Sequence, residues 1–196
     1  MKERYRKFIV LCIVVLSLLM PSCVYIRMTH LDDEDVRWIE NFNKYTTCRF
    51  TSNHGAHSLL AVKSYGIANS RNPFYFSSNS SSNYEAIASV RFEILQNDRL
   101  LEGFFGFRKI LPEKYLVLYA GLGDRDADDS LERDIKGFEY AGKLFKECVV
   151  LDSLNSYISR TSSYPFKSDV KEMVVSKEYG LIYYSFSDGE EFFRDF

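Results

Sequence analysis

One segment of the chain alternates strictly between apolar and polar residues, and this period of two limits the fold more than any other feature. Between Tyr84 and Leu95 the apolar positions are Ala88, Val90, Phe92 and Ile94, and the residues between them include a serine, an arginine and a glutamate. Successive side chains of a β-strand point to opposite faces. The segment is therefore predicted to be a strand with one face in a core and the other in solvent.

Turn signals separate this segment from other apolar stretches. Asn53-His54-Gly55 divides a predicted hairpin, and Asp188-Gly189 is a hairpin-turn dipeptide between apolar-rich stretches near the C-terminus. Further strands are expected at 100–110, 115–120, 142–151 and 170–176. With 16 Phe and 14 Tyr, which suit half-buried pleated surfaces, about eight to ten short strands are expected. The predicted fold class is mainly β, an antiparallel meander forming a sandwich or an open barrel.

Three stretches are expected to lie outside the strands. Thr29 to Asn43 is predicted to be a short amphipathic helix, capped by Thr29 or His30, with acidic residues in its first turn where the helix dipole favours them. The stretch 71–83 is rich in Ser and Asn and is expected to be an exposed loop. Gly121 to Asp134 is expected to be an acidic loop that runs into a short helix through Ile135.

The N-terminus is typical of a secretory signal peptide. Lys2, Arg4, Arg6 and Lys7 precede an apolar run from Phe8 to Met20, and Pro21-Ser22-Cys23 closes it. A run of 13 residues is short for a transmembrane helix, which needs roughly 20. We therefore expect a signal peptide at 1–22, a tether at 23–30 and a single β-rich domain at 31–196.

The cysteine at the end of the leader makes this segment resemble a bacterial lipoprotein signal, which implies acylation of Cys23. Met20 and Pro21 depart from the usual lipobox, in a manner similar to the relaxed lipoboxes of Bacteroidota. The alternative is ordinary secretion with Cys23 as a spare thiol. Val24 to Arg27 contains no acidic residue, whereas surface export in such lipoproteins is associated with acids there. The expected location is the outer membrane, facing the periplasm, with the cell surface as the alternative.

Two further segments resemble small uncharacterised outer-membrane lipoproteins of Bacteroidota type. They are Leu31–Ile39 and the tail that runs from Ser176-Lys177-Glu178-Tyr179-Gly180 through Asp188-Gly189-Glu190-Glu191-Phe192. The resemblance implies an envelope compartment and a β-rich fold, and it transfers no catalytic residues.

The net charge of the chain limits the kinds of partner it can bind. Without residues 1–22 the chain has 21 basic and 26 acidic residues and a net charge of −5. This balance, without a basic stripe, argues against nucleic acid as a partner.

Cys48 and Cys148 are the two cysteines of the domain. They form a disulfide in an oxidising compartment, or they are separate buried thiols; the sequence leaves both open.

Other candidate sites are weaker. His54 and His57 are a close histidine pair in an expected turn, and no third ligand is apparent. Asp124, Asp126 and Asp128 alternate as calcium ligands do, but Asp129 and Ile135 occupy positions where an EF-hand needs Gly and Glu. We predict no metal site and no cofactor.

Two surface features remain open. Ser130 and Ser153 each lie in an Asp-Ser-Leu triplet, which resembles an O-glycosylation signal of Bacteroidota. Phe74-Tyr75-Phe76 is either an aromatic platform for a sugar or peptide, or a means of pinning its loop to the core.

No nucleophile, metalloprotease or phosphate-loop motif is present in the sequence. The expected function is that of a membrane-anchored envelope lipoprotein with a non-enzymatic binding or assembly role. Its partners would be the membrane and an envelope protein complex or an apolar ligand. The alternative is an envelope hydrolase with an unrecognised active site.

Overall fold

The computed structural model describes residues 27–44, 47–69, 83–84, 86–97, 99–110, 115–130, 135–158 and 169–196. These residues form one helix, α2 (Asp33–Lys44), and the strands β1 (Arg27–Met28), β2 (Thr47–Ser52), β3 (His57–Ala68), β4 (Asn83–Tyr84), β5 (Ala86–Gln96), β6 (Arg99–Ile110), β7 (Tyr115–Leu122), β8 (Arg125–Ser130), β9 (Ile135–Tyr140), β10 (Lys143–Leu151), β11 (Tyr157–Ile158), β12 (Val170–Ser176), β13 (Gly180–Phe186) and β14 (Glu191–Arg194).

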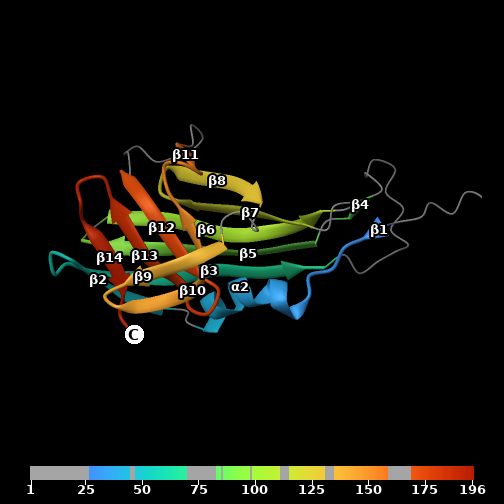
Figure 1. Ribbon diagram of the computed structural model, residues 1–196, viewed down its shortest axis with the longest axis horizontal. Helices are drawn as coiled ribbons and strands as arrows, with labels where there is room; N and C mark the ends of the chain where they lie inside the picture. Colours follow the sequence, from blue (N-terminus) through green and yellow to red (C-terminus); the bar gives the residue numbers. More distant parts are fainter. Residues whose placement is uncertain are drawn as a thin grey trace, which may run out of the picture.

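Twelve of the strands form one continuous sheet in the order β11-β8-β7-β6-β5-β3-β2-β14-β13-β12-β10-β9. Every neighbouring pair in it is antiparallel. The sheet curls, so that β12, β13 and β14 cross the long strands β3, β5 and β6 at an angle (Figure 1). The short strands β1 and β4 pair separately, in parallel. The predicted mainly β fold with an antiparallel meander is confirmed.

The strict alternation in the sequence corresponds to β5. Its side chains alternate between buried and more exposed from Ala86 to Gln96, and Val90, Phe92 and Ile94 are at most 1 % exposed. The hairpins around Asn53-His54-Gly55 and Asp188-Gly189 are also present, as β2–β3 and β13–β14. These local patterns predicted the strands correctly.

Two local expectations were wrong. The stretch expected to be an acidic loop contains β8, which pairs with β7 along its whole length, so the alternating acids are those of a strand. The helix is capped by Asp32, since the N–H of Asp35 donates to Asp32 Oδ1 at 2.9 Å and the N–H of Asp32 donates to Asp35 Oδ2 at 3.1 Å. Thr29 instead donates to the carbonyl of Lys109 (3.1 Å). The loop at 71–83 lies almost wholly outside the described residues.

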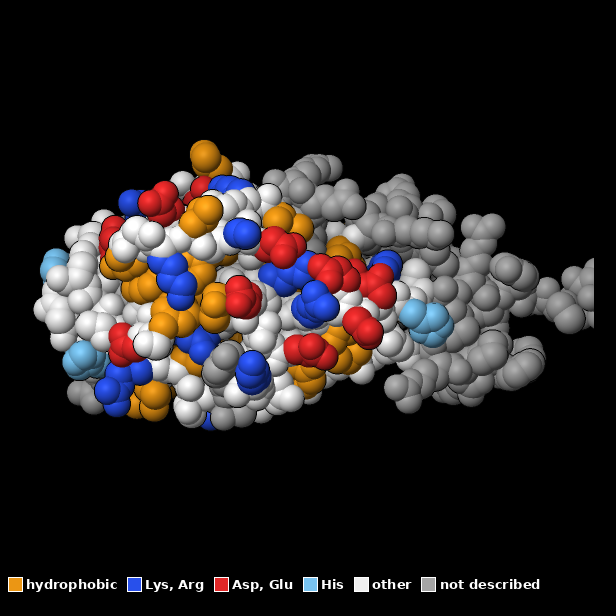
Figure 2. Space-filling model, turned by 60° about the horizontal axis from the view of Figure 1, so that its bottom comes forward, with side chains coloured by type: hydrophobic (Ala, Val, Ile, Leu, Met, Phe, Trp, Pro, Cys, Tyr) orange, Lys and Arg blue, Asp and Glu red, His pale blue; other side chains and the backbone are white. Residues whose placement is uncertain are grey.

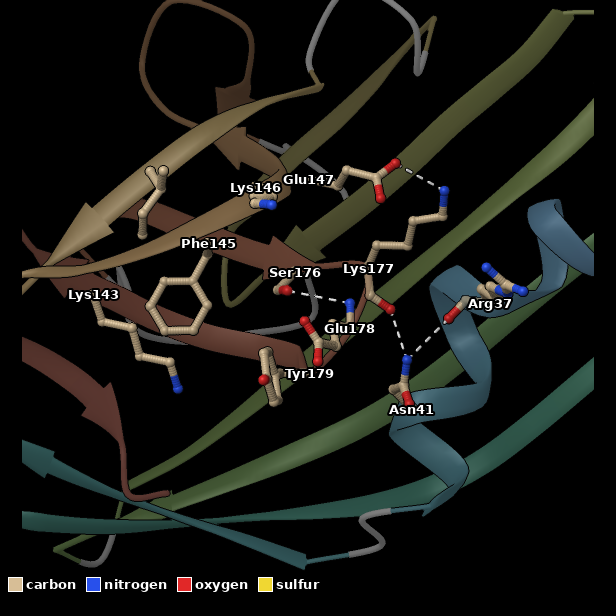
Figure 3. A pocket seen from close by; sticks show the side chains of 11 residues that line it. Arg37, Asn41, Lys143, Phe145, Lys146, Glu147, Ser176, Lys177, Glu178 and Tyr179 are labelled. Atoms are coloured by element: carbon tan, nitrogen blue, oxygen red, sulfur yellow. Dashed lines mark hydrogen bonds and ion pairs between the residues drawn. The ribbon is translucent and has the colours of Figure 1, made fainter.

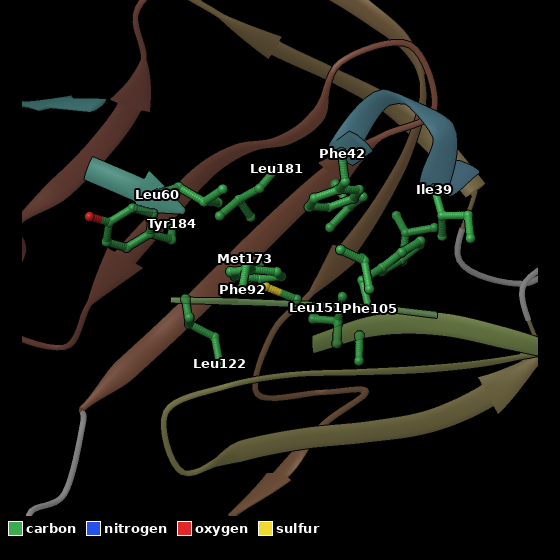
Figure 4. Packing of buried hydrophobic residues seen from close by; sticks show 14 of the residues in the cluster. Ile39, Phe42, Leu60, Phe92, Phe105, Leu122, Leu151, Met173, Leu181 and Tyr184 are labelled. Carbon is green, nitrogen blue, oxygen red and sulfur yellow. The ribbon is translucent and has the colours of Figure 1, made fainter. Parts of the chain in front are cut away.

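Aromatic rings fill the concave side of the sheet beneath α2. The Phe42 ring of α2 stacks on Phe92 and Phe105, at centroid distances of 5.6 and 6.0 Å, and the Trp38 ring lies 6.2 Å from that of Phe105. Further along the sheet, Tyr184 continues the same cluster (Figure 4). We call this cluster the inner core. It joins α2 to both arms of the sheet: the N-terminal arm, from β11 to β2 in the strand order, and the C-terminal arm, from β14 to β9.

The C-terminal arm also buries side chains on its other face. We call this the outer cluster; its buried members are Phe145, Cys148, Val150, Val174, Ile182 and Tyr183. The β9–β10 hairpin covers it, since the rings of Phe138 and Tyr140 lie 5.3 and 6.0 Å from Tyr183 on β13. Irregular register between Phe145 and Cys148 marks a bulge, which increases the local twist and allows the hairpin to fold back.

Candidate functional site

A pocket of about 440 Å³ opens where strand β10 separates from β12. Pairing between these strands ends at Cys148 and Ser176, whereas β10 remains paired with β9 as far as Lys143. The turn between β12 and β13 closes one side of the opening, and α2 closes another (Figure 3). The lining residues are Arg37, Asn41, Lys143, Leu144, Phe145, Lys146, Glu147, Ser176, Lys177, Glu178 and Tyr179.

Lys177 holds the helix against this turn. Its Nζ donates to Glu147 Oε1 at 2.9 Å and to Glu34 of α2, and its side chain is 11 % exposed. Asn41 of the helix donates to the carbonyl of Lys177 at 2.7 Å. Burial lowers the pKa of Lys177, but the hydrogen bonds and charges of both glutamates outweigh burial and raise it. The ammonium group is therefore neutralised by fixed partners.

Two features of the β12–β13 turn favour glycine at position 180. Its φ of +73° lies in the left-handed region, which few residues other than glycine adopt. A Cβ at this position would also lie 3.3 Å from the Phe42 ring. The turn can therefore approach the helix closely.

One wall of the pocket is aromatic. The Nζ of Lys143 lies 4.9 Å from the ring centroids of Phe145 and Tyr179 and 3.9 Å from that of Phe196. In Figure 2 hydrophobic side chains gather on one part of the face with basic and acidic side chains among them, and acidic and basic side chains are denser on the other part. The pocket thus combines rings that can stack with groups that can form ion pairs.

The lining carries an excess of positive charge. It contains four Lys or Arg residues and two Glu residues. Glu147 pairs with Lys177, and Glu34 pairs with Arg37 at 3.1 Å as well as with Lys177. Among the described residues, no carboxylate forms a salt bridge with Lys143 or Lys146. This arrangement suits a ligand that carries a carboxylate.

Of the two alternatives for Cys48 and Cys148, the disulfide is not present: both are free thiols. Cys48 belongs to the inner core and Cys148 to the outer cluster, and three strands lie between β2 and β10. Four strand spacings amount to about 19 Å along the sheet, well beyond the roughly 7 Å between Cα atoms that a disulfide permits. Burial raises the pKa of Cys148 to about 11 and also raises that of Cys48. The second alternative, separate buried thiols, describes them.

The other candidate residues are not brought together. His54 lies in the β2–β3 turn, and Nδ1 of His57 lies 3.2 Å from the hydroxyl of Thr51. In the described part of the chain, no group of three or more His, Cys, Asp or Glu residues could hold a metal ion. Ser130 ends β8, whereas Ser153 is exposed in the turn after β10. Cys23 and Phe74-Tyr75-Phe76 lie outside the described residues.

The sequence did not single out the pocket, but it held an indirect signal. The segments 31–39 and 176–192 contribute Arg37 on one side and Lys177 to Tyr179 on the other. The ion pair between Lys177 and Glu34 joins them. Segments far apart in the chain therefore meet at this pocket.

Comparison with known proteins yields no match to a family model, to a curated protein or to a solved structure. Among the residues that the structure describes, no helix has the length and apolar character needed to cross a membrane.

Acid is expected to loosen the attachment of α2. The hydrogen bond from the N–H of Asp35 lowers the pKa of Asp32 below 3.8, and Lys177 lowers the pKa of Glu34 below 4.5. Both groups have a lower pKa in the folded protein than in the unfolded chain. They therefore stabilise the fold when the pH is above their ordinary pKa values, and this stabilisation is lost as the pH falls through the pKa values of the folded protein. The melting temperature, followed by emission of the single Trp, Trp38, should therefore begin to fall once the pH drops below about 4.5, and it should continue to fall at lower pH.

The double variant Asp32→Asn with Glu34→Gln should lose less of its melting temperature over the same range, because its side chains stay neutral. Glu139→Gln, which removes an exposed carboxylate from β9, serves as the control and should behave as the native chain does. An equal fall in the double variant would show that other groups cause the acid sensitivity.

Proposed function

We propose that the chain is a membrane-anchored envelope lipoprotein that binds a partner and catalyses no reaction. In this proposal residues 1–22 are the signal peptide, Cys23 carries the lipid and residues 23–30 form the tether. The basic head, the short apolar run and the cysteine at its end support this assignment. The absence of acids from Val24 to Arg27 supports an outer-membrane location that faces the periplasm.

The position of the pocket supports a binding role. Aromatic side chains occupy the concave side of the sheet, where a barrel-like carrier would hold an apolar ligand. The pocket instead opens outside this core, between α2 and the β12–β13 turn, and its lining is cationic and aromatic. This supports recognition of an external partner, such as an envelope protein complex, over carriage of an enclosed apolar molecule.

The attachment point of the tether supports an accessible pocket. The hydroxyl of Thr29 accepts from the N–H of Ala86 and donates to Lys109, so the tether joins the domain at one end of the β5–β6 hairpin. The 11 residues of β5 extend about 35 Å from that end. Only residues 23–26 of the tether precede β1, which is paired with β4, and four residues reach up to roughly 14 Å. Under this proposal the far end of the β5–β6 hairpin can lie well away from the membrane surface.

We also propose Ser130 and Ser153 as glycan acceptors. Ser153 occupies an exposed turn in which the N–H of Asp152 donates to Asn155 Oδ1 at 2.9 Å. A modifying enzyme could reach such a hydroxyl without unfolding the sheet. Intact-mass measurement of the native protein and of Ser153→Ala tests this part of the proposal.

Replacing Cys23 with Ala is expected to abolish acylation and to release the protein from the membrane, because the thiol is the proposed acyl acceptor. Incorporation of an alkyne-labelled fatty acid, together with membrane fractionation, measures both effects. Cys12→Ala is the matched control, since it removes a thiol within the leader and should retain label and membrane location. A Cys23→Ala protein that kept its label and stayed in the membrane would overturn the lipoprotein assignment.

A further inference from the structure

Strand β10 presents an unpaired backbone edge to the pocket. Residues 143–147 all line the pocket. On one side β10 pairs with β9 as far as Lys143. On the other side, the N–H of Lys177, in the turn directly after β12, donates to the carbonyl of Glu147, and the pairing goes no further. No other strand of the described chain pairs with residues 143–146 on that side. The edge is available to another strand.

The turn between β9 and β10 determines which way the backbone N–H and C=O groups of this edge point. Ala141 and Gly142 have φ values of +48° and +77° and connect the paired residues Tyr140 and Lys143, as in a type I′ hairpin. The pair that flanks a two-residue turn exchanges both of its hydrogen bonds, and the next residue turns its own groups outward. The N–H and C=O of Leu144 therefore face the pocket.

The side chains around this edge favour an acidic segment. Lys146 is exposed beside it and, among the described residues, forms no salt bridge. Lys143 lies over an aromatic wall that extends to Phe196. Glu178 also lines the pocket, but Lys143 and Lys146 give the edge itself a positive charge, in contrast to the acidic domain as a whole.

We infer that an extended acidic peptide segment of a partner protein pairs with the open edge of β10, with its carboxylates near Lys146 and an aromatic or branched side chain against the half-buried Tyr179. This inference rests on the proposed binding role and names the partner class. Main-chain hydrogen bonds supply the affinity and the flanking side chains supply the preference for acids, as in other cases of strand addition.

Binding of a short peptide to the detergent-solubilised full chain tests the inference. The probe is acetyl-Glu-Val-Glu-Phe-Glu-amide, with a lysine-for-glutamate version and a version methylated at alternate backbone nitrogens as controls. Calorimetry gives the affinity, and hydrogen exchange reports the amide of Leu144. We expect the acidic peptide to bind, the Leu144 amide to become protected, and both control peptides to bind at least about tenfold more weakly.

Charge reversal at the edge provides the matched pair of variants. Lys146→Glu should weaken binding of the acidic peptide roughly tenfold, whereas Arg99→Glu, an exposed charge reversal at the start of β6, should leave it unchanged. The inference is wrong if the methylated peptide binds as well as its parent, if the lysine peptide binds equally, or if nothing binds at about 1 mM. Acylation of Cys23 is measured separately, so failure of this inference can be distinguished from failure of the lipoprotein assignment.

Discussion

Phe105→Ala is expected to lower the free energy of unfolding by about 3–5 kcal/mol, the range found for removal of a fully buried aromatic ring. Phe105 has no exposed surface, and its ring contacts both Trp38 and Phe42 of α2. The cavity would therefore open at the point where the helix meets the sheet. Urea unfolding followed by Trp38 emission measures the change.

Leu95→Ala is the control for this experiment. Leu95 is 54 % exposed on β5, so its truncation should change stability by no more than about 0.5 kcal/mol. A similar loss in both variants would show that the ring of Phe105 has no special part in holding the helix.

Gly103→Ala should destabilise the protein by about 1–3 kcal/mol, although it adds a single methyl group. A Cβ at this position would lie 2.2 Å from Cε2 of Phe92, whose side chain is 1 % exposed and stacks on Phe42. The ring cannot move without disturbing α2. Thermal unfolding of the variant, with Trp38 as the probe, measures the effect.

Gly66→Ala is the matched substitution, because no atom lies within 4 Å of the position its Cβ would occupy. Its stability should stay within about 0.5 kcal/mol of the native value. If Gly103→Ala were equally harmless, the packing of Phe92 against β6 would be looser than the structure indicates.

Patterns local to one strand or turn predicted much of the fold. The alternation in β5 and the turns at Gly55 and Gly189 act over a few residues, so they can be read from the sequence. Strand β8 was missed because aspartate is rare in strands, and its alternating acids resemble a loop. The helix cap was misplaced because His30 and Thr29 precede a better capping residue, Asp32.

The candidate site could not be predicted because it depends on long-range register. The pocket exists because pairing of β10 with β12 stops at Cys148 while pairing with β9 continues. Nothing local to Lys143 or Lys146 specifies where a neighbouring strand ends. A bulge in β13 also depends on pairing with a distant strand. Leu181 and Tyr184 of β13 belong to the inner core, whereas the two residues between them belong to the outer cluster.

The pairing of β14 with β2 has a consequence for how the protein reaches its native state. The N–H of Glu191 donates to the side chain of Asn53, 138 residues earlier, and β14 connects the two arms of the sheet. Strand β14 follows the other described strands in the sequence, yet it lies inside the sheet between β2 and β13, so the two parts of the sheet cannot join until this segment is in place. Contacts so distant in sequence form slowly. Pairing of β14 with β2 is therefore expected to be a late step of folding.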